Sequence, residues 1–437
     1  MAANCMTLEG SKNRSEESIS DISLDDVSDD ILFEILVRLP DCRSVIQKSS
    51  VSKRWFSLTF SPEFIRRFTN YHRQSQVAHS DSPPYTLLIQ GSTTHSPFYQ
   101  VFSEKSEILH RRLPSSDDSI TVDHNYLNFF SEPMVVHASF EDLLLVSPPI
   151  SLPLRDLNYY VCNPLTRQWL ELPAAPPRGW NFPCGYGLVC DRAQHTVMTR
   201  FRVVLLYSLL FPPDCSDQLL ASIFRSETGN WIESLVRAPS QFAYDQEFSP
   251  LCQMSYVESK VGLARNGSLH WLFYNSTSPT ACVVVAFNPF DETKQWRFIP
   301  PPADLYNPRF NIPYHSHTLV RILRLGVCRD RLRAYLVPNR GGLMIWELIH
   351  NHDVTAVSWS LVYDAGCCAG REVRYYGLSL HPSRDSVVFF SRGNRVFQSN
   401  VSKGVLEKVH KFEGKIGLGL CAFLLVHPPW PTPIPSI

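Results

Sequence analysis

Four tryptophans at nearly constant spacing constrain the fold of this chain more than any other feature of its sequence. Trp169, Trp231, Trp296 and Trp359 are 62, 65 and 63 residues apart. Each follows a polar turn and opens a new apolar stretch, as in "YVCNPLTRQWLELP" and "VAFNPFDETKQWRFIP". A strand, a turn and a return strand are typical of a hairpin, and a unit repeated every ~60 residues is typical of a repeat architecture.

The repeat predicts a β-propeller over residues 76–430. Weaker copies flank the four strong ones, with Leu109 sixty residues before Trp169 and Leu406 after Trp359. Six copies of a four-stranded unit predict six blades, with each Trp packed between neighbouring blades. A C-terminal strand in "LCAFLLVHP" is expected to complete the first blade. The other interpretation is two unrelated β-sandwiches with an accidental Trp spacing.

The N-terminal part has a different pattern. Residues 1–22 are polar and are expected to be a disordered tail. In "SDDILFEILVRLP", Ser28 is a plausible N-cap, Pro40 ends the helix, and one face is apolar. Short helices are expected around residues 43–50 and 52–60, with a fourth in "EFIRRFTNYHRQ". Since these helices form only a small core, the apolar face predicts a protein partner. That face consists of Ile31, Leu32, Ile35, Leu36 and Leu39.

Composition excludes several classes of partner. Lysine plus arginine and aspartate plus glutamate both number 41, so we expect no nucleic acid and no membrane as partners. We read no signal peptide and no apolar run of membrane-spanning length, and therefore expect a soluble protein of the cytoplasm, the nucleus or both. The twelve cysteines include no CxxC pair, which favours reduced, buried thiols over disulfides or a zinc site.

No catalytic motif stands out, so we expect no enzyme activity, no cofactor and no metal. A metal-dependent propeller enzyme is the alternative, because two H-x-H pairs could place ligands on one face of a strand. The pairs are His315 with His317 and His350 with His352, and no third ligand has a suitable spacing. Cys184 and Cys190 match no zinc pattern.

Two stretches resemble a known family. "LDDVSDDILFEILVRLPDCRSVIQKSSVSKRWFSLTFSPEF" resembles an F-box, although Asp26 and Ser52 replace a customary Pro and Cys. Cys162–Pro173 and Gly267–Leu272 are similar to motifs in the β domain of plant F-box/kelch-type proteins. The resemblance therefore implies a small all-α F-box at residues 23–75, a kelch-like β-propeller, and a Pro-rich tail at 431–437.

The resemblance implies a substrate receptor of an SCF-type E3 ubiquitin ligase that does no chemistry itself. The F-box would bind the Skp-type adaptor, and through it the cullin and RING subunits, while the propeller would hold a protein substrate. A scaffold that binds its partner without causing degradation is the alternative. The residues carried over as adaptor-binding are Ile31, Leu32, Ile35, Leu36, Leu39, Pro40, Val45, Val51 and Trp55.

The substrate face is predicted from the segments that follow each "LP". If each Trp hairpin joins the two outer strands of a blade, these segments cross to the next blade on one common face. Three of them are rich in aromatic residues and Arg, the types that dominate interface hot spots. Alternatively, the rings pack over the mouth of the propeller. The predicted substrate-binding residues are Arg178, Trp180, Phe182, Phe242, Tyr244, Tyr306, Arg309, Phe310 and Tyr314.

Overall fold

The chain divides into two compact units, Met1–Tyr71 and His72–Ile437. The sequence placed the boundary between residues 75 and 76. The predicted tail at 1–22 lies outside the described residues. A computed structural model describes residues 27–79, 84–92, 97–104, 127–149, 157–177, 183–191, 200–208, 218–237, 261–274, 282–291, 293, 295–306, 323–336, 343–350, 357–364, 376–392, 395–400, 405–411 and 421–434.

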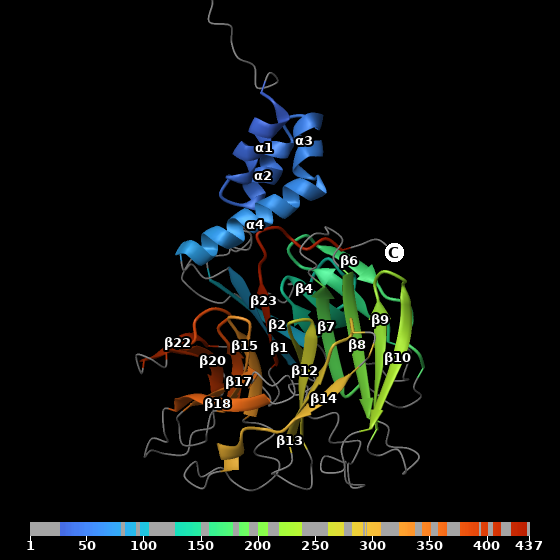
Figure 1. Cartoon of the computed structure of the whole chain (residues 1–437), viewed down its shortest axis with the longest axis vertical. Helices are drawn as coiled ribbons and strands as arrows, with labels where there is room; N and C mark the ends of the chain where they lie inside the picture. Colours follow the sequence, from blue (N-terminus) through green and yellow to red (C-terminus); the bar gives the residue numbers. More distant parts are fainter. Residues whose placement is uncertain are drawn as a thin grey trace, which may run out of the picture. The chain divides into compact units, whose positions relative to one another are not determined.

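Four helices open the chain (Figure 1), and their starts follow the capping rules. Ser28 is the N-cap of the first helix as predicted, but its side chain makes no capping hydrogen bond. Asp41 and Ser52 accept from the backbone N–H groups of Ser44 and Trp55, at 2.6 and 3.2 Å. The helices are α1 Asp29–Val37, α2 Cys42–Ser49, α3 Lys53–Thr59 and α4 Pro62–His79.

The helical unit buries one side of each short helix. Leu36 of α1, Val45 of α2 and Trp55 of α3 are buried together with Phe64 of α4. The Phe64 ring meets that of Phe33 edge to face, with centroids 5.1 Å apart. This core is small, so other apolar side chains of the same helices stay at the surface.

The second unit, called the β-domain below, begins within the last turns of α4 and consists mainly of antiparallel strands, with the short 3-10 helix η5 Ala303–Tyr306 among its described residues. The strands are β1 Tyr85–Ser92, β2 Pro97–Glu104, β3 Val135–Phe140, β4 Leu143–Ser147, β5 Tyr160–Asn163, β6 Gln168–Glu171, β7 Gly185–Asp191, β8 Arg200–Ser208, β9 Gln218–Arg225, β10 Asn230–Arg237, β11 Val261–Arg265, β12 Ser268–Tyr274, β13 Cys282–Phe287, β14 Trp296–Ile299, β15 Leu323–Cys328, β16 Arg331–Leu336, β17 Met344–His350, β18 Val357–Asp364, β19 Tyr376–Leu380, β20 Val387–Arg392, β21 Arg395–Asn400, β22 Val405–Lys411 and β23 Cys421–Val426.

The strands pair mainly with their neighbours in sequence. Three sheets have the orders β3-β4-β5-β6, β15-β16-β17-β18 and β19-β20-β21-β22. An eight-stranded sheet consists of two antiparallel sets, β7–β10 and β11–β14, joined by a short parallel pairing of Val261 and Gly262 with Tyr186 and Gly187. This succession of four-stranded units is what the tryptophan spacing predicted, and it excludes the interpretation as two β-sandwiches.

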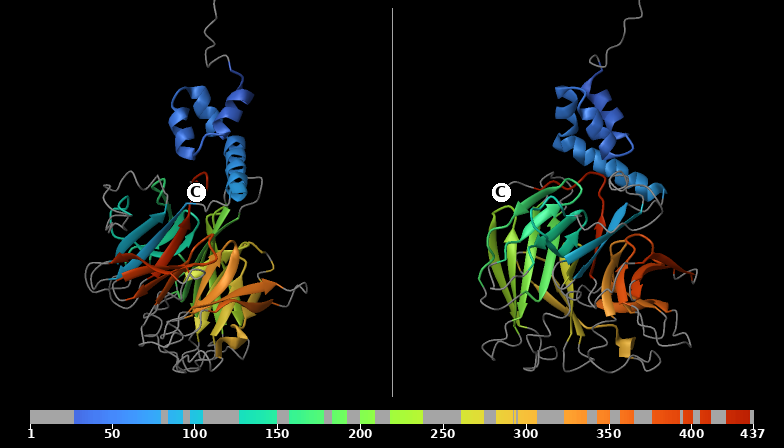
Figure 2. Two further views of the ribbon diagram at one scale, coloured as in Figure 1. Left: turned by 90° about the vertical axis from the view of Figure 1, so that its left-hand side faces the viewer. Right: turned by 180° about the vertical axis from the view of Figure 1, so that it is seen from behind.

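The C-terminal strand pairs with the first strand of the β-domain. β23 runs antiparallel to β1, with Tyr85 opposite Val426 and Gln90 opposite Cys421, in the sheet β2-β1-β23. The strand predicted in "LCAFLLVHP" therefore joins the first set, as expected. Figures 1 and 2 show the sets β7–β10 and β19–β22 on opposite sides of the β-domain. The fold is of the propeller type.

The four repeated tryptophans occupy the same strand of four successive sets, β6, β10, β14 and β18. Trp231 and Trp359 donate their indole N–H groups to the carbonyls of Pro173 and Pro300, at 2.8 and 2.7 Å. Each acceptor follows the outer strand of the preceding set, and Trp296 donates to the hydroxyl of Ser234 in β10 at 3.2 Å, so these three rings join neighbouring sets as predicted. Trp169 has other surroundings: it is 48% exposed and lies beside aromatic rings of its own set.

A second motif, Gly267–Leu272, also has a packing role. Gly267 has a φ of 73° in the β11–β12 turn, a backbone conformation that glycine adopts without strain. Trp271 is fully buried and donates to the carbonyl of Tyr186 at 3.0 Å, which ties β12 to β7. Its indole lies against Gly187 and Gly262, where an added Cβ would come within 3 Å of the ring.

Part of the predicted tail at 431–437 is held by the β-domain. Thr432 donates its backbone N–H and its hydroxyl to the carboxylate of the fully buried Asp142, at 2.8 and 2.5 Å. The side-chain amide of Asn163 donates to the same carboxylate and to the Thr432 carbonyl. Burial raises the pKa of Asp142, while the donors from Thr432 lower it. The segment after β23 therefore packs on the set β3–β6.

Candidate functional site

The helical unit exposes an unusual amount of apolar side chain. Large apolar residues that are more than 40% exposed occur on α1, on α2, before α3 and on α3 and its C-cap. Such side chains are costly to leave in water, and clusters of them mark interaction sites in soluble proteins. We call this set the apolar surface of the helical unit: Ile31, Ile35, Ile46, Val51, Phe56 and Phe60.

The nine residues predicted to bind an adaptor differ in burial: some form the core of the helical unit and others are exposed. Four of them, Leu32, Leu36, Val45 and Trp55, are buried and form the core of the unit. Leu39 is half-buried and Pro40 is exposed. Ile31, Ile35 and Val51 are 57%, 53% and 60% exposed, so they are the large apolar members of the set that a partner can reach directly.

The helical period explains this division on α1. Ile31 and Ile35 are four residues apart and share one face, whereas Leu32 and Leu36 share the next face and point into the core. The sequence reading treated all four as a single stripe. Because that stripe is wider than the small core can cover, its two isoleucines remain outside.

Sequence reasoning missed Ile46, Phe56 and Phe60. Phe56 and Phe60 are four residues apart, and their rings lie 4.5 Å apart between centroids. The i, i+4 spacing of two phenylalanines in "KRWFSLTF" was the signal that could have found them, because it predicts an aromatic pair on one helix face.

Ion pairs occur on the same helices. Glu34 of α1 contacts Arg38 and also Arg67 of α4, and the hydrogen bond from Arg38 lowers the pKa of this carboxyl. Arg54 of α3 binds Asp29 at 2.7 Å. The unit thus combines exposed apolar groups with charged groups, which is the composition of a protein-binding surface with a polar rim.

The predicted substrate-binding residues lie outside the described residues, except for the backbone of Tyr306. That residue ends η5, after the outer strand β14. The assignment of these nine residues stays a prediction. Their segments do follow outer strands and precede the first strand of the next set, since β6 leads to β7, β10 to β11 and β14 to β15.

A cavity of about 810 Å³ lies within the β-domain. Residues of eight strands line it: most come from β3, β7, β11, β15, β19 and β23, with Leu272 of β12 and Tyr335 of β16 beside them. The first strand of each complete set therefore faces the same central space. Arg324 lines the cavity and is buried there, and its burial lowers the pKa of its guanidinium. The cavity has the volume of a small-molecule site, but its lining mixes aliphatic side chains with charges of both signs.

The candidate metal ligands from the sequence are not brought together in the part of the chain that is described. Among the described residues, no group of three His, Cys, Asp or Glu side chains is arranged to hold a metal ion. His315, His317 and His352 lie outside those residues, as does the His350 side chain. Cys190 is buried and Cys184 is half-buried, both as free thiols. None of the helices that the structure describes combines the length and hydropathy of a membrane-spanning segment.

Comparison with known proteins identifies F-box proteins of Arabidopsis thaliana as relatives of this chain. F-box protein At5g49610 of Arabidopsis thaliana is 25% identical over 63% of this chain, and the match spans 65% of that protein, less than two thirds of its length. "Putative F-box/kelch-repeat protein At4g22430" of Arabidopsis thaliana is 24% identical over 84% of this chain and 76% of its own. The solved tricorn protease is 11% identical, with a TM-score of 0.33 over 75% of this chain and 26% of that one, which is too low to carry an argument.

A family model matches most of the β-domain. The matched segment, residues 113–411, covers more than half of the 437 residues and contains the strands from β3 to β22. The model is described as the β-propeller of proteins like F-box protein At3g26010. The resemblance read from Cys162–Pro173 and Gly267–Leu272 is therefore confirmed, and this chain belongs to the family of At3g26010-like F-box proteins with a β-propeller domain.

Proposed function

We propose that this protein is a substrate-recognition subunit of an SCF-type E3 ubiquitin ligase. The helical unit binds the Skp-type adaptor, which brings the cullin and RING subunits, and the β-domain holds the protein to be ubiquitinated. The observation that carries the proposal is the apolar surface of the helical unit, on a chain of the F-box propeller family. The receptor itself needs no catalytic group, so we propose that it is not an enzyme.

The β-domain is proposed to be a closed ring of six blades. Support comes from the strand sets: β3–β6, β7–β10, β11–β14, β15–β18 and β19–β22 each have four strands, and β2, β1 and β23 form a sixth. The cavity supports the same count, because the first strand of each four-stranded set and β23 all contribute to its lining. In such a ring β23 completes the first blade with strands from the other end of the domain, which closes the ring.

The proposal assigns adaptor binding to the exposed part of the predicted set. Fully burying an Ile side chain contributes about 1.5–3 kcal/mol, and because Ile31 and Ile35 are about half exposed, covering both adds about that amount in total, roughly tenfold to a hundredfold in affinity. Ile31→Ser combined with Ile35→Ser should therefore strongly reduce co-purification of the full chain with a Skp-type adaptor. The fold should survive, because both side chains are more than half exposed.

A matched control is available in the β-domain. Leu235 of β10 and Val362 of β18 are 56% and 47% exposed, so changing both to Ser removes a similar apolar area. This control should leave adaptor binding intact. Equal adaptor binding by both double variants would contradict the proposal. Ubiquitination of a captured substrate separates a receptor from a scaffold, because a scaffold would bind the adaptor without promoting transfer.

A further inference from the structure

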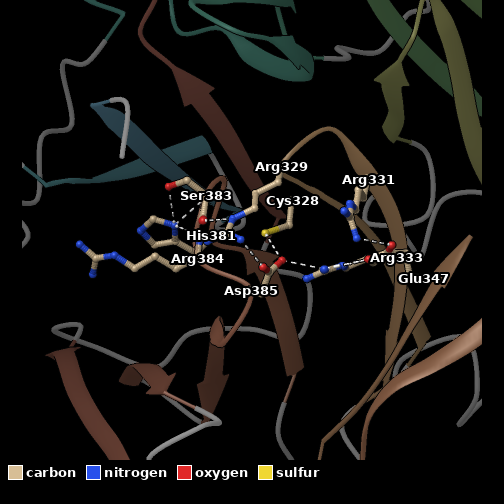
Figure 3. Close-up of polar contacts among 9 residues, drawn as sticks. All are labelled: Cys328, Arg329, Arg331, Arg333, Glu347, His381, Ser383, Arg384 and Asp385. Atoms are coloured by element: carbon tan, nitrogen blue, oxygen red, sulfur yellow. Dashed lines mark hydrogen bonds and ion pairs between the residues drawn. The ribbon is translucent and has the colours of Figure 1, made fainter. Parts of the chain in front are cut away.

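A chain of alternating charges links two neighbouring sheets of the β-domain (Figure 3). Arg331 binds Glu347 at 2.8 Å, and Arg333 binds the same carboxylate at 2.8 Å. Arg333 also binds Asp385 at 2.6 Å, and Asp385 in turn binds Arg329 at 2.8 Å. Three arginines and two carboxylates thus alternate: Asp385 comes from the β19–β20 turn, and the other four come from β16, β17 and the β15–β16 turn. We call these five residues the arginine chain.

Backbone contacts fix the position of one end of the arginine chain. Arg329 donates its backbone N–H to the carbonyl of Pro382 and its Nε to that of Ser383, at 2.8 and 2.7 Å. His381, which is fully buried, accepts at Nδ1 from the backbone N–H groups of Ser383 and Arg384, both at 3.1 Å. The buried His381 therefore fixes the backbone of the β19–β20 turn. Because Arg329 is hydrogen-bonded to this turn, the position of its guanidinium is fixed as well.

The charges in the chain do not cancel. The side chain of the central Arg333 is only 6% exposed, and its charge is satisfied by two carboxylates. Arg329 and Arg331 stand at the two ends with side chains that are 61% and 59% exposed, and each meets one carboxylate. One positive charge remains in excess, and the exposed guanidiniums at both ends carry donors that these contacts leave unused.

Neighbouring groups keep this surface positive. Arg384 lies in the β19–β20 turn next to Asp385, and Arg265 donates from Nε to the backbone carbonyl of Asp330 at 2.7 Å. The Asp330 side chain, in the β15–β16 turn, carries the opposite, negative charge. Cys328 is buried at the base of the cluster, where burial raises the pKa of its thiol to about 12, so it adds no negative charge.

Two residues of the arginine chain, Arg329 and Asp385, lie in the turns between the first and second strands of two sets, while Arg331 and Arg333 lie in β16 and Glu347 in β17. Asp330 and Pro382, from those same turns, line the cavity of the β-domain. In a propeller the crossings between blades lie on the opposite face from these turns, because successive strands run antiparallel. The surface is therefore distinct from the crossing segments that carry the predicted substrate-binding residues.

We propose that the arginine chain binds an anionic group, phosphate or carboxylate, on a segment of the protein substrate. The proposal rests on the proposed function as a substrate receptor. Exposed guanidiniums bind phosphate and carboxylate through paired N–H donors. A nucleic acid would need a longer basic track, whereas the whole chain has equal numbers of acidic and basic residues. The shared chemistry is therefore a short anionic peptide.

The test uses the full chain in complex with the adaptor and three oriented peptide libraries. All three share degenerate flanks and differ at one fixed central residue, which is phosphoserine, aspartate or serine. We expect retention of the phosphoserine library, the aspartate library or both above the serine library, and loss of that preference at high salt. The phosphoserine and aspartate arms distinguish a phosphorylated from an acidic substrate. Equal retention of the three libraries would overturn the proposal.

Substitution of the two exposed arginines tests whether the arginine chain is the site that binds the peptide. Arg329→Gln with Arg331→Gln should weaken binding of the preferred library about tenfold or more, since one hydrogen bond to a charged group is worth about that factor. Arg167→Gln with Arg395→Gln removes the same charge from two other exposed positions of the β-domain and should not change binding. An equal loss in both double variants would indicate a general charge effect and reject the site.

Two further measurements distinguish loss of the anion site from two other causes of weak binding: misfolding of the variant and failure of the proposed receptor function. Arg329→Lys with Arg331→Lys keeps the charge and loses the forked geometry, so its binding should fall between that of the Gln variant and the unchanged chain. Binding by the Lys variant as strong as by the unchanged chain would reject recognition through paired guanidinium donors, and an unchanged thermal transition of each variant excludes misfolding as the cause of a loss. Adaptor co-purification reports on the proposed function alone, since the arginine chain lies in the β-domain and adaptor binding is assigned to the helical unit.

Discussion

The helical unit and the β-domain differ in how completely they bury their apolar side chains. Of the large apolar residues that are exposed among the described residues, seven lie in the short helical unit and four in the much longer β-domain. The β-domain pairs its strands from β1 to β23 and even binds residues after its last strand through Asp142. The β-domain thus covers most of its apolar side chains with its own strands, whereas the helical unit leaves apolar side chains exposed, as expected if a partner covers them.

The largest loss of stability should come from Trp271→Ala, which tests whether the β-domain and the helical unit fold separately. The side chain is fully buried, packs on two glycines and binds the Tyr186 carbonyl, so its removal should cost about 3–5 kcal/mol of β-domain stability. Denaturant unfolding followed by fluorescence measures this loss. Adaptor binding of the natively purified variant should persist, because the helical unit has its own core. Loss of both together would show that the two units do not fold separately.

Two adjacent residues of α1 test the same contrast within the helical unit. Leu36→Ala should cost about 2–5 kcal/mol, because Leu36 is buried in the small core. Ile35→Ala should change stability by less than about 0.5 kcal/mol, because Ile35 is more than half exposed. Far-ultraviolet circular dichroism during thermal unfolding of residues 1–79 measures both changes. Similar losses would mean that Ile35 belongs to the core and not to the apolar surface.

The sequence predicted the elements better than the surfaces. Trp169 and its three equivalents revealed the four-stranded unit, because a packing residue recurs at the same place in each set. The burial of Leu32 beside an exposed Ile31 was not predictable, since both are aliphatic and only the size of the core decides which is covered. The arginine chain was also missed: Arg333 and Asp385 are far apart in sequence, and no local pattern signals their ion pair.

A third prediction concerns acid and the closing strand. His427 follows β23, is buried, and lies 2.9 Å from the hydroxyl of Thr86 in β1; burial lowers its pKa from an ordinary 6.5 to about 4. The folded chain therefore binds fewer protons than the unfolded chain between these pH values, so stability falls as pH falls through this window, by about 3 kcal/mol in total. Urea unfolding at pH 7, 5.5 and 4.5 measures the loss.

His427→Gln isolates this contribution. Glutamine keeps a hydrogen-bonding group near Thr86 but does not titrate, so the variant should lose less stability than the unchanged chain on acidification. The buried Asp142 has a raised pKa and acts in the opposite direction, and it is present in both proteins. The difference between the two pH profiles therefore reports His427 alone. Parallel profiles would show that burial of His427 does not control the acid response.

The smallest effects should come from the repeated tryptophans and should differ among them. Trp231→Phe and Trp359→Phe each remove one hydrogen bond to a proline carbonyl of the preceding set, which should cost about 1 kcal/mol while most of the ring packing is kept. Trp169→Phe should cost less, because that ring is nearly half exposed and packs on Phe130 and Tyr160. Urea unfolding of the three variants at pH 7 gives the ranking. Equal losses of unfolding free energy in the three variants would contradict this ranking. They would mean that the hydrogen bond to the preceding set adds nothing to the stability that each tryptophan provides.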